Sequence, residues 1–418
     1  MNKQETATFA KYIVCPSSIK SSKIPLNGLG EQEFDSYKYR ILSENYKSDS
    51  IYTNEILLEY IKNAIINTTS KNKKPLLLLS DGKDSLSLAV AYNELKISCD
   101  TLTLLRRDDK EMMEYIKEVT VKMGHAAYFV TVDEIIDSFD LNSFKESFQY
   151  MNTLVLDQGY LFFLFGLKRF FENNNLDASE FEVIDGLGND EYFGHLMSKQ
   201  QWQSFKLSQL GLWKIVPNSL KSLKWYIRSP SESHGDLSTL ACFFNLSQAY
   251  DLNKYFKDIP KFTNREEYLD FRAFSRGSFH DHQCMMGKTD AASRYLGSRC
   301  IFPWLDKDLA DYCFNIPIDE KLDFENIVNK IPLRKLLDEK IGWNQEKRGV
   351  DLFYDLDMDL FVGEIVKELI PSDIIDIIKN NKILNSGVKK RAYLELMNFY
   401  AYCVSKDMTK NEIREMLL

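Results

Sequence analysis

A short loop from Ser80 to Ser85 holds residue types suited to binding an anionic group. Its sequence is Ser-Asp-Gly-Lys-Asp-Ser, and it follows a continuous apolar run from Leu76 to Leu79. Such a run is typical of a central parallel strand, and a helical pattern from Ser85 to Leu95 comes after the loop. Small residues at a strand-to-helix turn leave backbone N–H groups open to a phosphate, and the helix adds the positive end of its dipole.

Each polar residue of this loop has an expected role. Ser80, Gly82 and Ser85 are expected to bind pyrophosphate, and Lys83 adds a positive charge. Asp84 would repel phosphates unless it holds a magnesium ion that bridges them. An ordinary turn of Ser, Asp and Gly is the structural alternative. The loop is not a Walker A loop, because the GxxxxGK[ST] spacing is absent.

A second loop with glycines follows another predicted strand, Phe181 to Ile184. It runs from Asp185 to His195 and contains Gly186, Gly188, Asp190 and Glu191. Two strand-end loops that each carry a carboxylate can converge above a sheet. We therefore expect Asp84 and Asp190 to hold magnesium on a triphosphate. A glycine-rich turn with a solvated acidic pair is the alternative.

The elements that must position these loops alternate between strand and helix. The pattern predicts helices at Thr53–Ile66, Lys110–Met123 and Tyr160–Phe171, and strands at Thr101–Leu105 and Ala127–Thr131. This alternation predicts an α/β fold whose parallel sheet is covered by helices on both faces. Beyond about Gly194 the pattern is mainly helical, and Trp202, Trp213 and Trp225 are expected to pack in the core there.

Composition narrows the class of protein. The chain has 418 residues and a net charge of -8, which argues against nucleic acid as the main partner. Its seven cysteines are scattered and form no CxxC pair, so reduced thiols are expected. The sequence contains no apolar stretch of signal-peptide or membrane-spanning length. We expect a cytoplasmic protein with neither a membrane nor a nucleic-acid partner.

Both loops resemble motifs of known families. The first resembles the SGGxDS pyrophosphate loop of the N-type ATP pyrophosphatases, with Asp81 in place of the first glycine. The second resembles SGEGADELFGGY, a motif in the synthetase domain of asparagine synthetases. The matching residues are Gly186, Gly188, Asp190, Glu191, Phe193 and Gly194. The departures are Asp185, Leu187, Asn189 and His195.

Three further motifs resemble that family, and the first of them spans two segments. Lys288 to Ser293 is similar to its DRASM motif, and Phe302 to Asp306 to its E-x-R-x-P-F-L-D motif, in which Arg299 and Ile301 replace the Glu and the Arg. Lys330-Ile331-Pro332-Leu333-Arg334 resembles its K-x-x-LR motif, and Glu346-Lys347-Arg348-Gly349-Val350 resembles its R-P-K-Q-G-F motif.

The five motifs occur in family order between about residues 54 and 355. The resemblance implies an asparagine-synthetase-like ATP pyrophosphatase domain at 53–355, with a five-stranded parallel sheet. An irregular segment at 1–52 is expected before it. Residues 356–418 are expected to form a helical C-terminal extension of the same domain.

The resemblance also implies a two-step ligase reaction with ATP and Mg²⁺ as cofactors. A substrate carboxylate attacks the α-phosphorus of ATP and pyrophosphate leaves; a nitrogen nucleophile then displaces AMP and an amide forms. Asp84 and Asp190 are the implied magnesium ligands, and Asp190 and Glu191 are implied catalytic residues. Lys347 is the implied cation where charge develops in both steps.

The substrate pocket is expected to include Leu187, Arg299 and Asp290, and Leu104 and Leu105 are expected to face adenine. Arg299 changes the charge of the pocket wall relative to the family, and Leu187 removes a carboxylate. Free aspartate is therefore expected to be a poor substrate. A different carboxylate, in a small molecule, a sugar acid or a peptide, is expected instead.

The nitrogen source is expected to lie outside this chain. Glutamine-dependent relatives begin with a glutaminase domain whose first residue after the initiator is a catalytic cysteine. Here Asn2 follows Met1, and too few residues precede Ser80 to form such a domain. Ammonia, an amine or a separate glutaminase subunit is expected to supply the nitrogen.

Two other functions remain open from the sequence. A PP-loop enzyme that modifies RNA has the same fold, but the acidic charge and the second loop argue against it. A catalytically inactive nucleotide-binding homologue is suggested by Asp81 and Leu187. Retention of Asp84, Asp190 and Lys347 argues against this second alternative.

Two conspicuous clusters are interpreted as structural. The run His280-Asp281-His282 resembles a metal site, but adjacent side chains diverge on a strand or a helix, so a solvated segment is favoured. Arg106-Arg107 precedes Asp108-Asp109, which favours a turn whose charges compensate one another.

Overall fold

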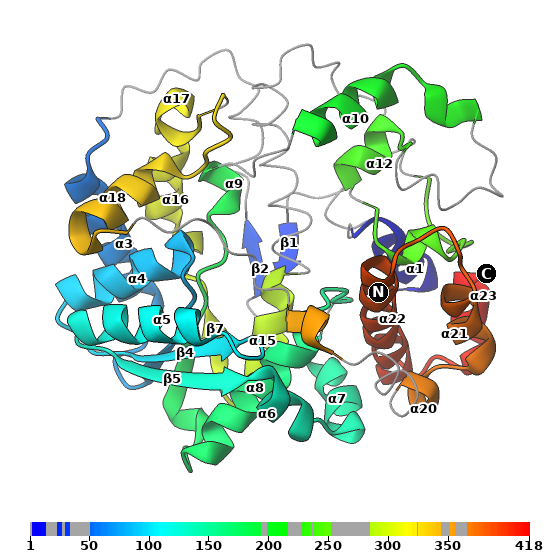
Figure 1. Cartoon of the computed structure of the whole chain (residues 1–418), viewed down its shortest axis with the longest axis horizontal. Coiled ribbons are helices and arrows are strands. Elements are labelled where there is room, and N and C mark those ends of the chain that lie inside the picture. Colours follow the sequence, from blue (N-terminus) through cyan, green and yellow to red (C-terminus); the bar gives the residue numbers. More distant parts are fainter. Residues whose placement is uncertain are drawn as a thin grey trace.

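A parallel sheet with flanking helices and a separate group of C-terminal helices make up the computed structural model (Figure 1). The structure describes residues 2–13, 23–26, 30–33, 51–151, 153–193, 199–215, 227–235, 237–251, 285–323, 325–343, 352–356 and 366–418.

The sheet has five strands in the order β5-β4-β3-β6-β7, and every neighbouring pair is parallel. The strands are β3 (Lys74–Leu78), β4 (Asp100–Leu105), β5 (Ala126–Thr131), β6 (Phe181–Ile184) and β7 (Arg299–Ile301). The predicted α/β fold with a five-stranded parallel sheet is confirmed. The sequence pattern indicated four of these strands. It did not indicate β7, because three residues are too few to show a periodicity.

Successive strand residues face opposite sides of the sheet and divide the core in two. Leu76 packs into one hydrophobic cluster and Leu77 into the other, and Val183 and Ile184 divide in the same way. One face is covered by α6 (Val132–Asp137), α7 (Leu141–Ser147), α8 (Tyr160–Asn173) and α15 (Met286–Tyr295). The other is covered by α3 (Asn54–Thr68), α4 (Lys83–Glu94), α5 (Lys110–Lys122), α16 (Lys307–Phe314) and α18 (Ile331–Ile341). The helices predicted within 53–171 are confirmed.

The C-terminal part is helical, as predicted. It consists of α20 (Lys367–Leu369), α21 (Ser372–Lys379), α22 (Ser386–Ser405) and α23 (Lys410–Leu417). The long helix α22 is largely buried and packs against α7 and η1 (Phe148–Tyr150). Its buried Glu395 accepts hydrogen bonds from Thr239 Oγ1 at 2.7 Å and from the Leu240 N–H at 3.1 Å. This carboxylate ties α22 to η5 (Leu240–Cys242).

Parts of the N-terminal segment, which was predicted to be irregular, form a helix and two strands. Residues Lys3–Tyr12 form α1, which begins with a capping box between Asn2 and Glu5. The helix packs against α23, and Lys3 forms an ion pair with Glu412. The strands β1 (Lys23–Leu26) and β2 (Gly30–Glu33) pair antiparallel. A ten-residue helix is marginal alone, so its stability depends on this docking, which sequence periodicity does not reveal.

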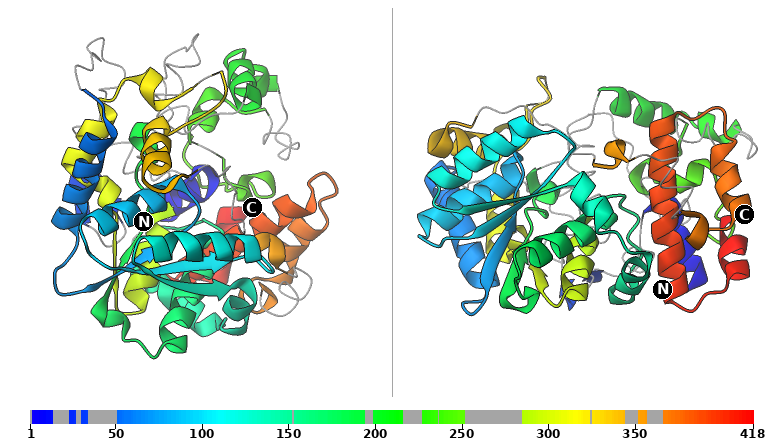
Figure 2. Two further views of the ribbon diagram at one scale, coloured as in Figure 1. Left: turned by 60° about the vertical axis from the view of Figure 1, so that its left-hand side comes forward. Right: turned by 60° about the horizontal axis from the view of Figure 1, so that its bottom comes forward.

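Short helices complete the described chain: α9 (Asp190–Phe193), α10 (Lys199–Gln209), α12 (Pro230–Gly235) and α17 (Ile318–Lys321). Figure 2 shows α10 and α12 at the periphery, away from the sheet. Trp202 on α10 and Trp213 are half-buried rather than core residues, and Trp202 stacks on Phe205. Trp225 lies outside the described residues. Among the described helices, none combines the length and the apolar character needed to cross a membrane.

Candidate active site

Two loops meet at the carboxyl edge of the sheet, as the sequence predicted. One follows β3 and leads through Gly82 into α4; the other follows β6 and contains Gly186. A Cβ atom on Gly186 would lie 2.9 Å from the backbone nitrogen of Ser85, closer than real Cβ atoms approach backbone. Only glycine therefore allows this contact between the loops. Gly188 has a φ of +119°, which also favours glycine.

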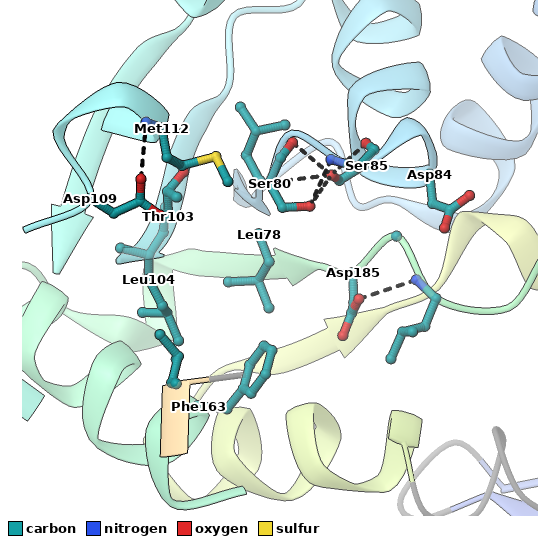
Figure 3. Close-up of a pocket in the computed structure, with 16 residues that line it drawn as sticks. Leu78, Ser80, Asp84, Ser85, Thr103, Leu104, Asp109, Met112, Phe163 and Asp185 are labelled. Carbon is teal, nitrogen blue, oxygen red and sulfur yellow. Dashed lines mark hydrogen bonds between the residues drawn. The ribbon is translucent and has the colours of Figure 1, made fainter. Parts of the chain in front are cut away.

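The first loop is closed by its own hydroxyl groups (Figure 3). The Ser80 N–H donates to Ser85 Oγ at 3.2 Å, and the Gly82 N–H donates to Ser80 Oγ at 3.1 Å. The two hydroxyl oxygens lie 3.3 Å apart. The N-cap residue of α4 is Gly82, which has no side chain to accept hydrogen bonds from the first N–H groups of the helix. An anion would therefore not compete with a capping side chain for these N–H groups.

A buried ammonium group joins the two predicted magnesium ligands. Lys330 Nζ donates to Oδ1 and Oδ2 of Asp84, at 2.8 Å each, and lies 2.6 Å from Asp190 Oδ1. It also donates to Asn189 Oδ1 at 2.6 Å, and Asn189 Nδ2 donates to Asp84 Oδ1 at 2.9 Å. Four residues from three segments of the chain therefore form one network, which we call the Lys330 cluster (Asp84, Asn189, Asp190 and Lys330).

The members of the Lys330 cluster differ in exposure. The Lys330 side chain is 3% exposed, whereas those of Asp84 and Asp190 are 33% and 29% exposed. Burial by itself would lower the pKa of Lys330, but the Asp190 and Asp84 carboxylates outweigh it and raise this pKa above its usual value. The ammonium group is thus firmly charged, and both carboxylates stay accessible.

The backbone also places Lys330 unusually. Lys330 precedes α18 with φ 54° and ψ 42°, the left-handed region that non-glycine residues seldom adopt. Pro332, in the first turn of α18, fixes the direction of the helix. The sequence placed Lys330 in a family-like motif but gave no role to its side chain. Its position in that motif was the only available signal.

The two loops line one cavity of about 230 Å³. Its polar part contains Ser80, Asp84, Ser85 and Asp185 (Figure 3). Its apolar part contains Leu78, Leu102, Leu104, Met112, Phe163 and Leu352. Leu104 lines the cavity as predicted for a residue that faces adenine. Leu105, predicted beside it, points to the opposite face of the sheet and is buried in the other hydrophobic cluster.

Asp81 and Lys83 do not line this cavity; both are buried. The Asp81 carbonyl oxygen accepts a hydrogen bond from Trp343 Nε1 at 3.2 Å. Burial, and then the charge of Asp81, raise the pKa of Tyr115 on α5 to about 12. Asp81 is therefore not among the residues that would touch a ligand in this cavity. The contribution expected from Lys83 to the cavity is not seen.

Asp185 occupies the cavity wall at the end of β6. Its Oδ2 accepts a hydrogen bond from Thr289 Oγ1 at 2.7 Å, and its Oδ1 accepts one from the Leu187 N–H at 3.1 Å. Burial raises the pKa of Asp185 above its usual value. Leu187 lines the cavity next to it. Sequence reasoning noted Asp185 as a departure from the family motif but did not place it in the pocket.

The other predicted pocket residues lie elsewhere. Arg299 Nε donates to Glu182 Oε1 at 2.6 Å, on the neighbouring strand β6. Asp290 on α15 is buried, and Arg294 Nε donates to its Oδ2 at 3.1 Å. Neither Arg299 nor Asp290 lines the cavity. Matching the family motif placed both residues near the site, but their side chains are committed to ion pairs outside it.

Another buried lysine, Lys288, lies behind the cavity wall. Lys288 Nζ is 3.0 Å from Asp157 Oδ1, and both side chains are 8% exposed. The same ammonium lies 4.7 Å from the centroid of Phe163, a ring that lines the cavity. The Asp157 carbonyl oxygen accepts a hydrogen bond from Asn398 Nδ2 of α22. The Lys288–Asp157 pair therefore braces the cavity wall against the C-terminal helices.

The predicted catalytic Lys347 lies outside the described residues, as does the side chain of Glu191. The described residues nearest to Lys347 on either side contact the site: Trp343 bonds to Asp81, and Leu352 lines the cavity. The cluster His280-Asp281-His282 is likewise outside the described residues.

The charges of Arg106 and Arg107 are compensated, but not by the predicted partners. Arg106 Nη2 lies 3.1 Å from Asp355 Oδ1, and the Arg107 N–H donates to Asp355 Oδ2 at 2.7 Å. The Arg107 side chain pairs with Asp133. Asp109 instead caps α5 by accepting from the Met112 N–H. The prediction of a self-compensating turn is wrong in its ion-pair partners, which are Asp355 and Asp133 of α6.

Comparison of the sequence with protein-family models found no match, and comparison with curated proteins found no significantly similar sequence.

Proposed function

We propose that the chain is an ATP-dependent amidoligase that adenylates a substrate carboxylate and transfers the acyl group to ammonia or an amine. The observation that carries this proposal is that Asp84 and Asp190 both contact Lys330 beside the serine loop of the cavity. Two carboxylates at the ends of neighbouring parallel strands, next to hydroxyl groups and a helix N-terminus, suit a magnesium–triphosphate group.

The two parts of the cavity suit the two parts of a nucleotide. Leu78, Leu104 and Phe163 offer an apolar compartment for a nucleobase. Ser80 and Ser85 lie in its polar part, at the start of α4, and would bind phosphate oxygens through their hydroxyl groups. The order base, phosphates, carboxylates follows the cavity from its apolar to its polar part.

The two carboxylates, Asp84 and Asp190, fit a magnesium ion that is bound together with a nucleotide. Among the described residues no group of three or more His, Cys, Asp or Glu side chains could hold a metal ion. Magnesium commonly takes only one or two carboxylates and completes its shell with waters and substrate phosphates. Asp84 and Asp190 would hold it here, and when bound it would neutralise the charge of the pyrophosphate leaving group.

The proposed reaction makes and breaks one bond in each step. In the first step a carboxylate oxygen of the substrate bonds to the α-phosphorus while the bond to the β-phosphate bridge oxygen breaks. In the second step the nitrogen attacks the acyl carbon, AMP leaves, and the nitrogen loses a proton. Ser80 and Ser85 would orient the leaving pyrophosphate. Lys347 stays a prediction for the cation that offsets the charge developing in both steps.

The carboxylate substrate is proposed to differ from free aspartate. Leu187 lines the cavity where the family has a glutamate, and Arg299 is engaged with Glu182. Asp185 adds a buried carboxyl group to the cavity wall, and burial raises the pKa of this group above its usual value. A larger acid, in a small molecule, a sugar acid or a peptide, is proposed, with ammonia, an amine or a separate glutaminase as the nitrogen source.

The test is the product balance. Purified protein is supplied with ATP, Mg²⁺, a panel of carboxylic acids and, in turn, ammonium, glutamine or candidate amines. We expect AMP and pyrophosphate in equal amounts, and transfer of oxygen-18 from a labelled carboxylate to AMP. ADP and phosphate as the products would contradict the proposal. So would glutamate release from glutamine by this chain alone, or activity only on RNA.

A further inference from the structure

The Lys330 ammonium lies between the two carboxylates that the proposed function assigns to magnesium. It has three protons to donate and three partners within 2.8 Å: Asp84, Asp190 and the amide of Asn189. No proton of this buried group is left for water or a ligand. The arrangement therefore holds the carboxylates on one shared cation.

We infer that Lys330 keeps divalent cations from binding between Asp84 and Asp190 until a nucleotide supplies phosphates, so that metal and nucleotide bind together. This inference concerns the order of binding and rests on the proposed function for the identity of the nucleotide. Lys330 is thus a positioning residue whose charge regulates the site.

The first reason is charge. Two carboxylates and one ammonium leave the Lys330 cluster with a net charge of about -1, a weak attraction for a strongly hydrated dication. Without the ammonium the same carboxylates would carry about -2 and face each other at close range. Like charges held together in this way favour binding of a cation.

The second reason is the cost of moving Lys330. The Lys330 side chain is 3% exposed. If its ammonium group moved away from both carboxylates and found no other acceptor, it would be a buried charge without a partner, which is strongly unfavourable. Its backbone is already in the left-handed region and leads directly into α18, so main-chain adjustment is restricted. A free metal ion offers the displaced ammonium nothing to bind.

The third reason is that phosphates remove this obstacle. A triphosphate bound over Ser80 and Ser85 would bring anionic oxygens next to Asp84, and the ammonium could donate to them instead. Asp84 and Asp190 are each about a third exposed, so both can then reach a new cation. When the nucleotide binds, phosphate oxygens replace carboxylate oxygens as acceptors for the Lys330 ammonium group. The positive charge of Lys330 therefore keeps an anionic partner throughout.

The experiment measures manganese binding by electron paramagnetic resonance of the full chain, with and without α,β-methylene ATP, whose bridging carbon prevents cleavage. For the unaltered protein we expect the analogue to tighten manganese binding by at least about a hundredfold. For Lys330→Met we expect binding without nucleotide to tighten by at least about tenfold. Lys335→Met, an exposed lysine on the same helix, serves as the matched control and should behave like the unaltered protein.

Two results would overturn the inference. One is equally tight manganese binding by the unaltered protein with and without the analogue. The other is a folded Lys330→Met variant, judged by near-ultraviolet circular dichroism, that gains no affinity for manganese. If this variant does not fold, the comparison on the unaltered protein still decides the matter. Failure of the analogue to bind at all would instead contradict the proposed function, and the nucleotide-free comparison would still test Lys330.

Discussion

Lys288 and Lys330 are both buried and paired with aspartate, but their surroundings differ. Lys288 and its partner Asp157 are both 8% exposed, and the pair is sealed by Phe163. Lys330 is as deeply buried, but its carboxylate partners are about a third exposed and line or adjoin the cavity. A pair that is closed to water can only brace the fold. A buried cation whose anions remain accessible can exchange partners, which is the property a ligand site needs.

The largest effect is expected from breaking the closed pair. Lys288→Met would leave Asp157 charged and buried without its partner. The free energy of unfolding should fall by about 3–5 kcal/mol, measured by urea denaturation. The double variant Lys288→Met with Asp157→Leu should regain most of this loss, since it removes both charges. A single variant as stable as the unaltered protein would contradict the closed-pair interpretation.

The next largest effect concerns the open cluster. Asp84→Asn or Asp190→Asn should lower pyrophosphate release by at least about a hundredfold, because the charge next to the leaving group is lost. Unfolding should change far less than for Lys288→Met, since the remaining carboxylate still pairs with Lys330. Near-normal release in a steady-state assay of either variant would refute its assignment as a ligand.

A smaller effect is expected from pH, through buried carboxyl groups away from the cavity. Burial raises the pKa of Asp290 and of Glu395 to about 7 each. The folded protein then keeps protons that the unfolded chain releases above its ordinary carboxyl pKa. Each group should therefore lower stability as pH rises from about 4 to 7, by up to about 1.4 kcal/mol per pH unit. Above pH 7 this contribution is constant.

The pH prediction is checked by urea denaturation of Asp290→Asn and Glu395→Gln between pH 5 and pH 8. Each variant should have a flatter dependence on pH below 7 than the unaltered protein. The same change at exposed Glu320 leaves the slope as it was. Identical slopes in all four proteins would show that neither buried group titrates in this range.

The smallest effect is expected at an exposed pair that joins α18, the helix after Lys330, to α17. Lys335 lies 2.9 Å from Glu320, and both side chains are about half exposed. Lys335→Met should change the free energy of unfolding by less than about 1 kcal/mol and leave pyrophosphate release unchanged. If Lys335→Met lowered the free energy of unfolding as much as Lys288→Met does, burial would not explain why the two ion pairs differ in strength.

The sequence by itself determined the architecture that carries the site. Apolar runs such as 101–105 and amphipathic patterns such as 110–123 are local signals, and four strands and their helices follow from them. The two loops after β3 and β6 were also recognisable, because each places glycine and acidic residues directly after a predicted strand. That Asp84 and Asp190 come close together depends also on the strand order, in which β3 and β6 are neighbours.

Only the tertiary structure decided which basic side chains contact the two carboxylates and which residues line the cavity. Lys330 reaches Asp84 across 246 positions of sequence, and no local pattern encodes such a contact. The orientation of Arg299 toward Glu182, and the burial of Asp81 outside the cavity, depend on the neighbouring elements in the fold. Helix α1 exists through its docking on α23. Local periodicity specifies elements, but the partners of charged side chains are chosen by packing over long sequence distances.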